Sequence, residues 1–478
     1  MIILDHTIKL ILIFLLVFTP LAWGSMDLWA SSVMELGILL IIVLWGLQLM
    51  MKSTSNQGRT PGTRSMVIER QWAFPAVLLA VFVGLVIFQT VNLPSMLIQI
   101  VSAKTVELRS QLQVSSEQVS RVTLSFLPHA TKLELFKWFA FTGLFFFLLS
   151  WKLSEEGYRV TGQFIWVLLV VGCLESLYGL YGAFGRGGSG MGTFVNRNHF
   201  AGYLLMIIPL AVGLLFAREV SQRRRFNGWV SRLTSLDGRG ILIGFGVILM
   251  ILGLLFSTSR MGISSLLISF SLIMVTLRSR RAERRFSKKS ALILGLAVLW
   301  GAWIGLDAVV SRFFTTSEDF GKRWQIWADT SQIIKDFPLF GAGLGSFAQI
   351  FPMHRSFHIR GLVSHAENDF LQLASDTGLI GLGLLFAVFV YLFFKAATRI
   401  RALSEGEPQR YIAIGGLVSI LAIMFHSLVE RNIQVPANAF LYTMLWAVVL
   451  TATSKKTVDE ALGTEHGAWS QRHVEQEK

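Results

Sequence analysis

The chain has 478 residues, of which 53% are hydrophobic and only 15% are charged. Soluble domains carry about 25% charged residues, so this composition excludes a soluble multi-domain enzyme. The single cysteine, Cys173, excludes a fold held together by internal disulfides. We therefore predict a polytopic membrane protein.

Twelve apolar stretches along the chain are candidates for membrane spans. A helix needs about 20 apolar residues to cross the hydrocarbon core of a bilayer. In chain order the stretches are 8–24, 29–51, 73–92, 134–151, 162–184, 198–217, 240–257, 262–277, 290–308, 378–396, 411–429 and 436–453. The first lacks a basic leader and a small-residue cleavage site, so we predict that it is retained. The predicted fold class is all-α, with about twelve transmembrane helices.

The net charge of +14 raises the question of a nucleic-acid partner, but the distribution of the charge favours another explanation. With a cytoplasmic N-terminus, the inner loops hold 27 Lys and Arg and the outer loops hold 14. This excess follows the positive-inside rule and is concentrated in short loops such as 218–239 and 278–289. We expect these clusters to contact anionic membrane lipids, and we expect no nucleic-acid partner.

One outer loop, 309–377, is far longer than a connection between two spans requires. The spacing of its apolar residues predicts an amphipathic helix over 324–336, so the loop is expected to be partly helical. Long loops on a rigid scaffold are where function concentrates. The predicted organisation is spans 1 to 9 over 1–308 with a smaller outer loop at 93–133, the large outer loop at 309–377, spans 10 to 12 over 378–453, and a cytoplasmic tail at 454–478.

Several motifs of enzyme chemistry are missing from the sequence. It contains no GxxxxGK[ST] phosphate-binding loop and no HExxH or CxxC metal motif. The glycine-rich stretch 185–190 follows a membrane span rather than a strand, so it is not a dinucleotide-binding fingerprint. His365 and Glu367, two residues apart, are a weak metal signal. We therefore expect no metal, no nucleotide and no other cofactor.

Two arginines stand at the outer ends of predicted spans. Arg197 lies in Asn-Arg-Asn-His at the start of one span, and Arg260 lies in an outer turn too short to be a solvated loop. A charge at this depth is costly unless it is paired or faces a polar cavity. Arginines that converge from two helices can bind a diphosphate through paired hydrogen bonds. The alternative is that each side chain snorkels to the membrane interface.

Histidines supply the candidates for proton transfer. His365 lies in the long outer loop just before a span, and histidine is the side chain whose ordinary pKa is near neutrality. It is therefore the best candidate for a general base or acid, although a lone loop histidine can also be structural or merely exposed. His426 lies near the outer end of the eleventh span, with Glu430 and Arg431 after it. It either orients a polar network or packs between helices.

Four motifs in this order resemble the O-antigen ligase and O-antigen polymerase superfamily of bacterial envelope glycosyltransferases. They are Gly192-Thr-Phe-Val-Asn-Arg-Asn-His-Phe-Ala-Gly202, the Ser-Arg-Met-Gly turn at 259–262, Arg323-Trp324 followed by Gly341-Ala-Gly-Leu-Gly345, and His365-Ala-Glu-Asn-Asp with Gly378-Leu-Ile-Gly381. The resemblance covers about 190–430. The family also has a long outer loop between late spans, which is the place of 309–377 here.

The resemblance implies an inverting, metal-independent glycosyl transfer at the periplasmic face of the bacterial inner membrane. The implied donor is a glycan on undecaprenyl diphosphate, and the implied acceptor is another sugar, such as that of lipid A-core. Arg197 and Arg260 are implied to hold the donor diphosphate, and His365 to assist attack by the acceptor hydroxyl. Arg323 and His426 are further candidates for substrate binding.

The sequence leaves the subtype open among a ligase, a polymerase that extends the lipid-linked glycan, and transfer to protein. We favour the broad ligase-like assignment. A transporter or lipid flippase would need ionisable residues near helix midpoints, whereas the unusual charges here lie at the outer ends of spans. A peptidoglycan polymerase of the shape, elongation, division and sporulation class would rely on an outer-face carboxylate, and the motifs here centre on arginine and histidine.

Overall fold

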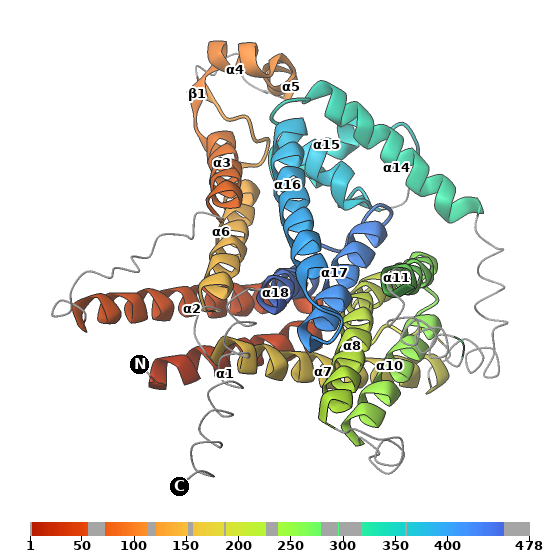
Figure 1. The fold of residues 1–478 in the computed structure, drawn as a ribbon. Coiled ribbons are helices and arrows are strands. Elements are labelled where there is room, and N and C mark those ends of the chain that lie inside the picture. Colours follow the sequence, from red (N-terminus) through yellow and green to blue (C-terminus); the bar gives the residue numbers. More distant parts are fainter. Residues whose placement is uncertain are drawn as a thin grey trace, which may run out of the picture.

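The structure is a computed structural model, and it describes residues 2–55, 72–112, 121–151, 156–185, 188–225, 238–278, 295, 317–358 and 361–453. Within these ranges the chain is almost entirely helical (Figure 1). The predicted span at 290–308, apart from residue 295, and the tail at 454–478 lie outside them.

The helices of the N-terminal half are α1 (Ile2–Leu21), the short 3-10 helix η1 (Trp23–Ser25), α2 (Leu28–Ser55), α3 (Ala73–Thr90), α4 (Ser95–Val101), α5 (Ala103–Leu112), α6 (Pro128–Trp151), α7 (Glu156–Gly185) and α8 (Arg197–Arg225). Those that follow are α10 (Gly238–Phe256), α11 (Arg260–Arg278), α14 (Ser317–Asp336), α15 (Phe347–His354), α16 (Asp369–Ala402), α17 (Pro408–His426) and α18 (Pro436–Ala452). Two short strands, β1 (Leu93–Pro94) and β2 (Arg121–Val122), pair antiparallel.

Ten helices of the described chain are long and apolar enough to cross a membrane, namely α1, α2, α3, α6, α7, α8, α10, α11, α16 and α17. Each coincides with a stretch predicted from hydropathy. An eleventh predicted stretch, 436–453, is the shorter apolar helix α18. The prediction of an all-α polytopic membrane protein is confirmed.

Helices α8 and α17 form the centre of the bundle. In a membrane-length window, 94% of the residues of α8 and 72% of those of α17 are buried, against 22–50% for the other candidate spans. A side chain on Gly415 of α17 would lie 2.5 Å from the carbonyl oxygen of Pro209 in α8, so glycine allows the two backbones to approach closely. This pair is the rigid scaffold for the segments that follow each helix.

Helix α16 is interrupted at Gly378, where φ is +68° and ψ is −178°. Only glycine adopts this backbone conformation readily. The backbone N–H groups of Leu379 and Ile380 bond to the carbonyls of Pro338 and Leu339 instead of continuing the helix ladder. The residues before the break, from Asp369 onwards, were predicted to belong to the outer loop, but they form a helical segment that leads directly into the span.

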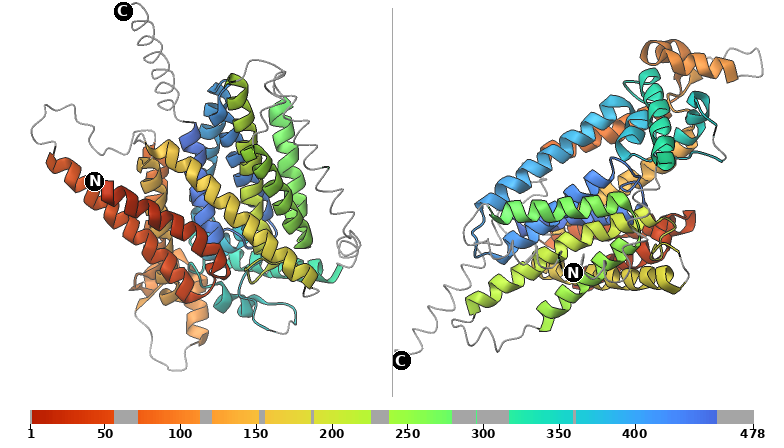
Figure 2. Two further views of the ribbon diagram at one scale, coloured as in Figure 1. Left: turned by 90° about the horizontal axis from the view of Figure 1, so that it is seen from below. Right: turned by 90° about the vertical axis from the view of Figure 1, so that its right-hand side faces the viewer.

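The large predicted loop is partly helical, as expected, because α14 and α15 fold against a small apolar core of their own. Its members include Ile333, Phe337, Phe347 and Phe351. Figure 2 shows that α14 and α15 lie at the same end of the bundle as α4 and α5, and that α1 begins on the opposite side. We call the end that carries α14 and α15 the loop end of the molecule.

Candidate functional site

The turn before α16 presents His365 at the loop end. Its neighbour Asn368 caps α16, since the side-chain oxygen accepts hydrogen bonds from the backbone N–H groups of Phe370 and Leu371, both at 3.0 Å. Glu367 takes a left-handed conformation with φ of +51°, which turns the chain sharply into the helix. The His-Ala-Glu-Asn-Asp motif is thus a helix-capping turn that holds His365 outside the first turn of α16.

The segment 427–435, between α17 and α18, is fastened onto this capping turn. Asp369 Oδ2 accepts the backbone N–H groups of Asn432 at 2.9 Å and Ile433 at 2.8 Å. The amide of Asn368 donates to the Leu428 carbonyl at 2.6 Å. Two segments more than 60 residues apart in sequence are therefore held side by side, and each brings one polar side chain to the site.

Glu430 ties two further elements to the same segment. Its carboxylate accepts from Arg323 of α14 in a close ion pair and from Asn198 of α8 at 2.5 Å. Arg323 also donates to the Val429 carbonyl at 2.7 Å. Burial raises the pKa of the Glu430 carboxyl to about 7, although the charge of Arg323 lowers it. We call Arg323, Asn368, Asp369 and Glu430 the anchor network.

A cavity of about 640 Å³ opens beside this segment, between α3, α6, α16 and α18. Its wall is mostly apolar and includes Phe141 of α6, Leu385 and Phe389 of α16, and Trp446 of α18. Its ionisable lining includes Glu134, Lys137, His365 and Arg431, which we call the cavity rim, and also Asp369 and Asp376. The cavity therefore suits an amphipathic ligand with a charged head and a hydrocarbon chain.

His365 has polar partners on both ring nitrogens. Nε2 contacts a terminal nitrogen of the Arg431 guanidinium closely, and Nδ1 lies 3.2 Å from the amide nitrogen of Gln372. Burial first, and then the charge of Arg431, lowers the pKa of His365 to about 3. The imidazole is therefore neutral at physiological pH, which is the form that a general base requires.

Arg431 is the cation nearest to His365. Besides the contact with His365, its other terminal nitrogen lies 3.8 Å from the sulfur of Met26. Burial lowers the pKa of its guanidinium, and the carboxylates of Glu367, Asp369 and Glu430 oppose that change. Arginine stays charged in proteins, so the cavity rim carries a permanent positive charge beside a neutral imidazole.

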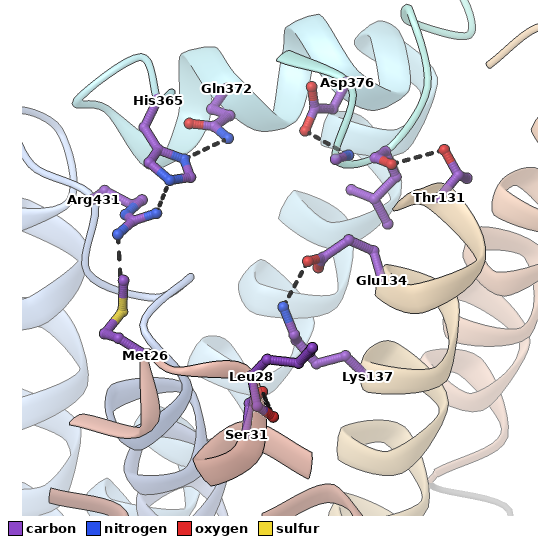
Figure 3. Close-up of polar contacts among 12 residues, drawn as sticks. Met26, Leu28, Ser31, Thr131, Glu134, Lys137, His365, Gln372, Asp376 and Arg431 are labelled. Carbon is purple, nitrogen blue, oxygen red and sulfur yellow. Dashed lines mark hydrogen bonds and ion pairs between the residues drawn. The ribbon is translucent and has the colours of Figure 1, made fainter. Parts of the chain in front are cut away.

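A second pair stands across the cavity from this one. Lys137 of α6 forms an ion pair with Glu134 at 2.6 Å, one turn earlier on the same helix. Figure 3 shows the His365–Arg431 pair and the Glu134–Lys137 pair on opposite sides of an open space. The rim therefore holds one cation that is matched by a carboxylate and one that contacts an imidazole.

Arg197 and Arg260 each begin a helix, and a hydrogen bond joins Arg197 to the turn before Arg260. Arg197 begins α8 and donates to Thr258 Oγ1 at 3.4 Å, in the turn that leads into Arg260 at the start of α11. Neither arginine lines the cavity that contains His365. The first turn of α8 lies near the His365–Arg431 pair, because His199 interacts electrostatically with both residues. The role of the two arginines stays a prediction.

The two further candidates, Arg323 and His426, also lie outside the cavity lining. Arg323 donates hydrogen bonds to the Val429 carbonyl and to the Glu430 carboxylate. His426 is fully buried in the last turn of α17, near His199 and Arg323. Among the described residues, neither of its ring nitrogens has a hydrogen-bond partner. Their predicted part in substrate binding stays a prediction.

Sequence reasoning missed Lys137 and Arg431 as rim residues. Lys137 lies inside a predicted span, and a charge within a span is a functional candidate by default, so a signal was present. Arg431 had no comparable signal, because its contact with His365 joins residues 66 positions apart. Within the described part of the chain, no three His, Cys, Asp or Glu side chains are grouped so that they could hold a metal ion.

Comparison with known proteins bears on the later part of the chain. Residues 245–386 match the family model described as O-antigen ligase. Arg260, Arg323 and His365 lie within the match, and Arg197 and Arg431 lie outside it. None of the curated proteins matches the chain. The family match supports an O-antigen ligase- or polymerase-like function in general, and it agrees with the resemblance seen in the motifs: residues 245–386 of this membrane protein are similar to the O-antigen ligase family.

Proposed function

We propose that this protein is a ligase-like glycosyltransferase that moves a glycan from undecaprenyl diphosphate to an acceptor sugar. The observation that carries the proposal is the cavity, whose apolar wall meets a rim with a neutral histidine and an arginine. An isoprenoid chain suits the wall, and a diphosphate suits the positive charge of the rim. The site would face the periplasm from the bacterial inner membrane, with both termini in the cytoplasm.

The reaction is a single displacement at the anomeric carbon of the donor glycan. The acceptor hydroxyl oxygen forms the new glycosidic bond, and the bond from that carbon to the diphosphate oxygen breaks. Undecaprenyl diphosphate leaves with the bonding electrons, and one displacement inverts the configuration. His365 takes the proton of the acceptor hydroxyl, a contribution that is typically worth about 10²–10⁴-fold in rate. Cations stabilise the charge that develops on the leaving group.

In this proposal Arg197 and Arg260, the arginines implied by the family resemblance, contribute to donor binding. Arg197 contacts Thr258, two residues before Arg260, and the two arginines would bind the donor diphosphate or a part of the glycan close to it. Arg323 and His426 would act beneath the site, Arg323 through its ion pair with Glu430. The proposed acceptor is the sugar of lipid A-core. A polymerase performs the same displacement with a lipid-linked glycan as acceptor.

Deletion of the gene tests this function through the place where the glycan accumulates. Long polymer left on undecaprenyl diphosphate indicates a ligase, and single repeat units on the carrier indicate a polymerase. Unchanged surface glycan, with no second enzyme covering the loss, would contradict both and favour a transporter.

Complementation then tests His365. We expect His365→Ala to lower transfer by about 10²–10⁴-fold, because the general base is lost. His358→Ala is the matched control, since His358 is exposed in the same loop and is expected to restore wild-type glycan. Full activity of His365→Ala in membranes that contain the protein would remove His365 from the mechanism.

A further inference from the structure

Among the cations of the cavity rim, Arg431 is the one held by an uncharged partner. Lys137 has its carboxylate in Glu134 at 2.6 Å. Arg431 instead contacts the His365 imidazole and the Met26 thioether, and it forms no ion pair with a carboxylate of the described residues. The carboxylates of Glu367, Asp369 and Glu430 stabilise its charge from a distance, but within the described residues none of them accepts a hydrogen bond from it, so its hydrogen-bonding capacity is only partly used. Such a group is available to an anionic ligand.

The contact between Arg431 and His365 fixes the state of the imidazole. A guanidinium only donates hydrogen bonds, so His365 Nε2 must accept with its lone pair. A neutral imidazole has one such lone pair, and its other nitrogen carries the proton. The backbone N–H of Ala366 donates to Gln372 Oε1 at 3.0 Å, which turns the Gln372 amide nitrogen toward Nδ1. The contact with Gln372 raises the pKa of His365, but burial and the charge of Arg431 lower it more, so the imidazolium is disfavoured.

The same contact has a consequence for proton transfer. The lone pair on Nε2 is the one that a general base would use, and in this structure Arg431 occupies it. His365 can accept a proton from an acceptor hydroxyl only after the guanidinium has moved away. The backbone on both sides of Arg431 is held, because Asp369 accepts the N–H groups of Asn432 and Ile433 after it and Arg323 donates to the Val429 carbonyl before it. The change is therefore confined to the Arg431 side chain.

We propose that Arg431 is a donor-operated cap on His365: the diphosphate of the lipid-linked donor draws the guanidinium from the imidazole, and the lone pair becomes free for the acceptor hydroxyl. This inference rests on the proposed function. A bidentate ion pair with phosphate oxygens is far stronger than a contact with a neutral nitrogen, so the donor supplies the preference for the moved position. Arg431 thereby makes the base available only when a donor is bound.

Binding of a short polyprenyl diphosphate tests the first half of the proposal. The full-length protein in detergent is titrated with farnesyl diphosphate, with Arg431→Gln, Arg431→Lys and the control Arg401→Gln. Arg401 is an exposed residue at the far end of α16. We expect Arg431→Gln to weaken binding at least tenfold, Arg431→Lys to weaken it less, and Arg401→Gln to leave it unchanged.

The pH profile of kcat/KM tests the second half, because this parameter reports the groups of the free enzyme. The charge of Arg431 helps to keep His365 neutral. Without that charge the acid limb of the profile moves to higher pH in Arg431→Gln, and Arg431→Lys restores it. A purely structural role of Arg431 would lower the whole profile and leave the limb in place.

The outcomes separate the cap from the proposed function. If the wild type binds farnesyl diphosphate and Arg431→Gln binds it equally well, the cap is wrong and the proposed function stands. If the folded wild type binds none, the proposed donor site itself is wrong. Should Arg431→Gln fail to fold, the decision falls to Arg431→Lys, for which unchanged affinity overturns the proposal, since a lysine cannot reproduce the paired hydrogen bonds of a guanidinium.

Discussion

The cavity rim and the anchor network lie side by side at the loop end, yet their side chains are used in opposite ways. In the anchor network, Asp369 and Glu430 accept several hydrogen bonds from elements that they hold in place. On the rim, Arg431 and His365 contact each other and face the cavity. Glu430 and Arg431 are neighbours in sequence but belong to different groups.

This difference separates residues that position the site from residues that act in it. The anchor network joins α8, α14, the turn before α16 and the segment 427–435, so its loss should lower both stability and activity. The rim has few partners to lose, so substitutions there should lower activity and leave the fold intact. Each variant therefore needs two measurements, one of thermal unfolding and one of glycan transfer.

Asp369→Ala should have the largest effect among substitutions in the anchor network. The substitution removes the acceptor of two backbone N–H groups, and each buried group left without a partner costs about 1–3 kcal/mol. We expect a lower midpoint of thermal unfolding in detergent, with a parallel loss of transfer because segment 427–435 is released. Asp369→Asn, which keeps an acceptor oxygen, should lose less. An unchanged midpoint for the alanine variant would show that Asp369 does not anchor the segment.

Glu430→Gln should have a smaller effect, which shows in the pH dependence of stability. Burial raises the folded-state pKa of Glu430 from the ordinary 4.5 to about 7. Its favourable contribution to folding is therefore complete below pH 4.5 and is lost as pH rises through 7. The unfolding midpoint of the wild type should accordingly fall between pH 5 and 8, and Glu430→Gln should flatten that decrease.

The control for this pH dependence is Glu107→Gln. Glu107 pairs with Lys104 on α5, and its side chain is 51% exposed. Exposed pairs contribute little to stability, so this variant should keep the wild-type pH profile. A profile of Glu430→Gln that matches the wild type as well would contradict the account of Glu430.

The helices could be predicted from sequence, because hydropathy along one dimension is sufficient to find spans of 18 residues or more. Within the site, His365 was identified from its chemistry and its motif. The cavity could not be predicted, since it arises where α3, α6, α16 and α18 pack together. Arg431 is brought to His365 by the anchor network, in which hydrogen bonds of Asp369 and Asn368 join distant segments. The break at Gly378 explains why a predicted loop ends in a helix.

We propose that the cavity beside His365 holds the lipid part of the donor. The most direct measurement is photo-crosslinking with a polyprenyl diphosphate that carries a diazirine in its isoprenoid chain, followed by mass spectrometry of the labelled peptides. If the cavity holds the lipid, adducts form on Leu385, Phe389 or Trp446 of the cavity wall, and an unlabelled polyprenyl diphosphate displaces them. Adducts confined to outward-facing residues such as Leu10 and Leu36, with no displacement, would contradict it.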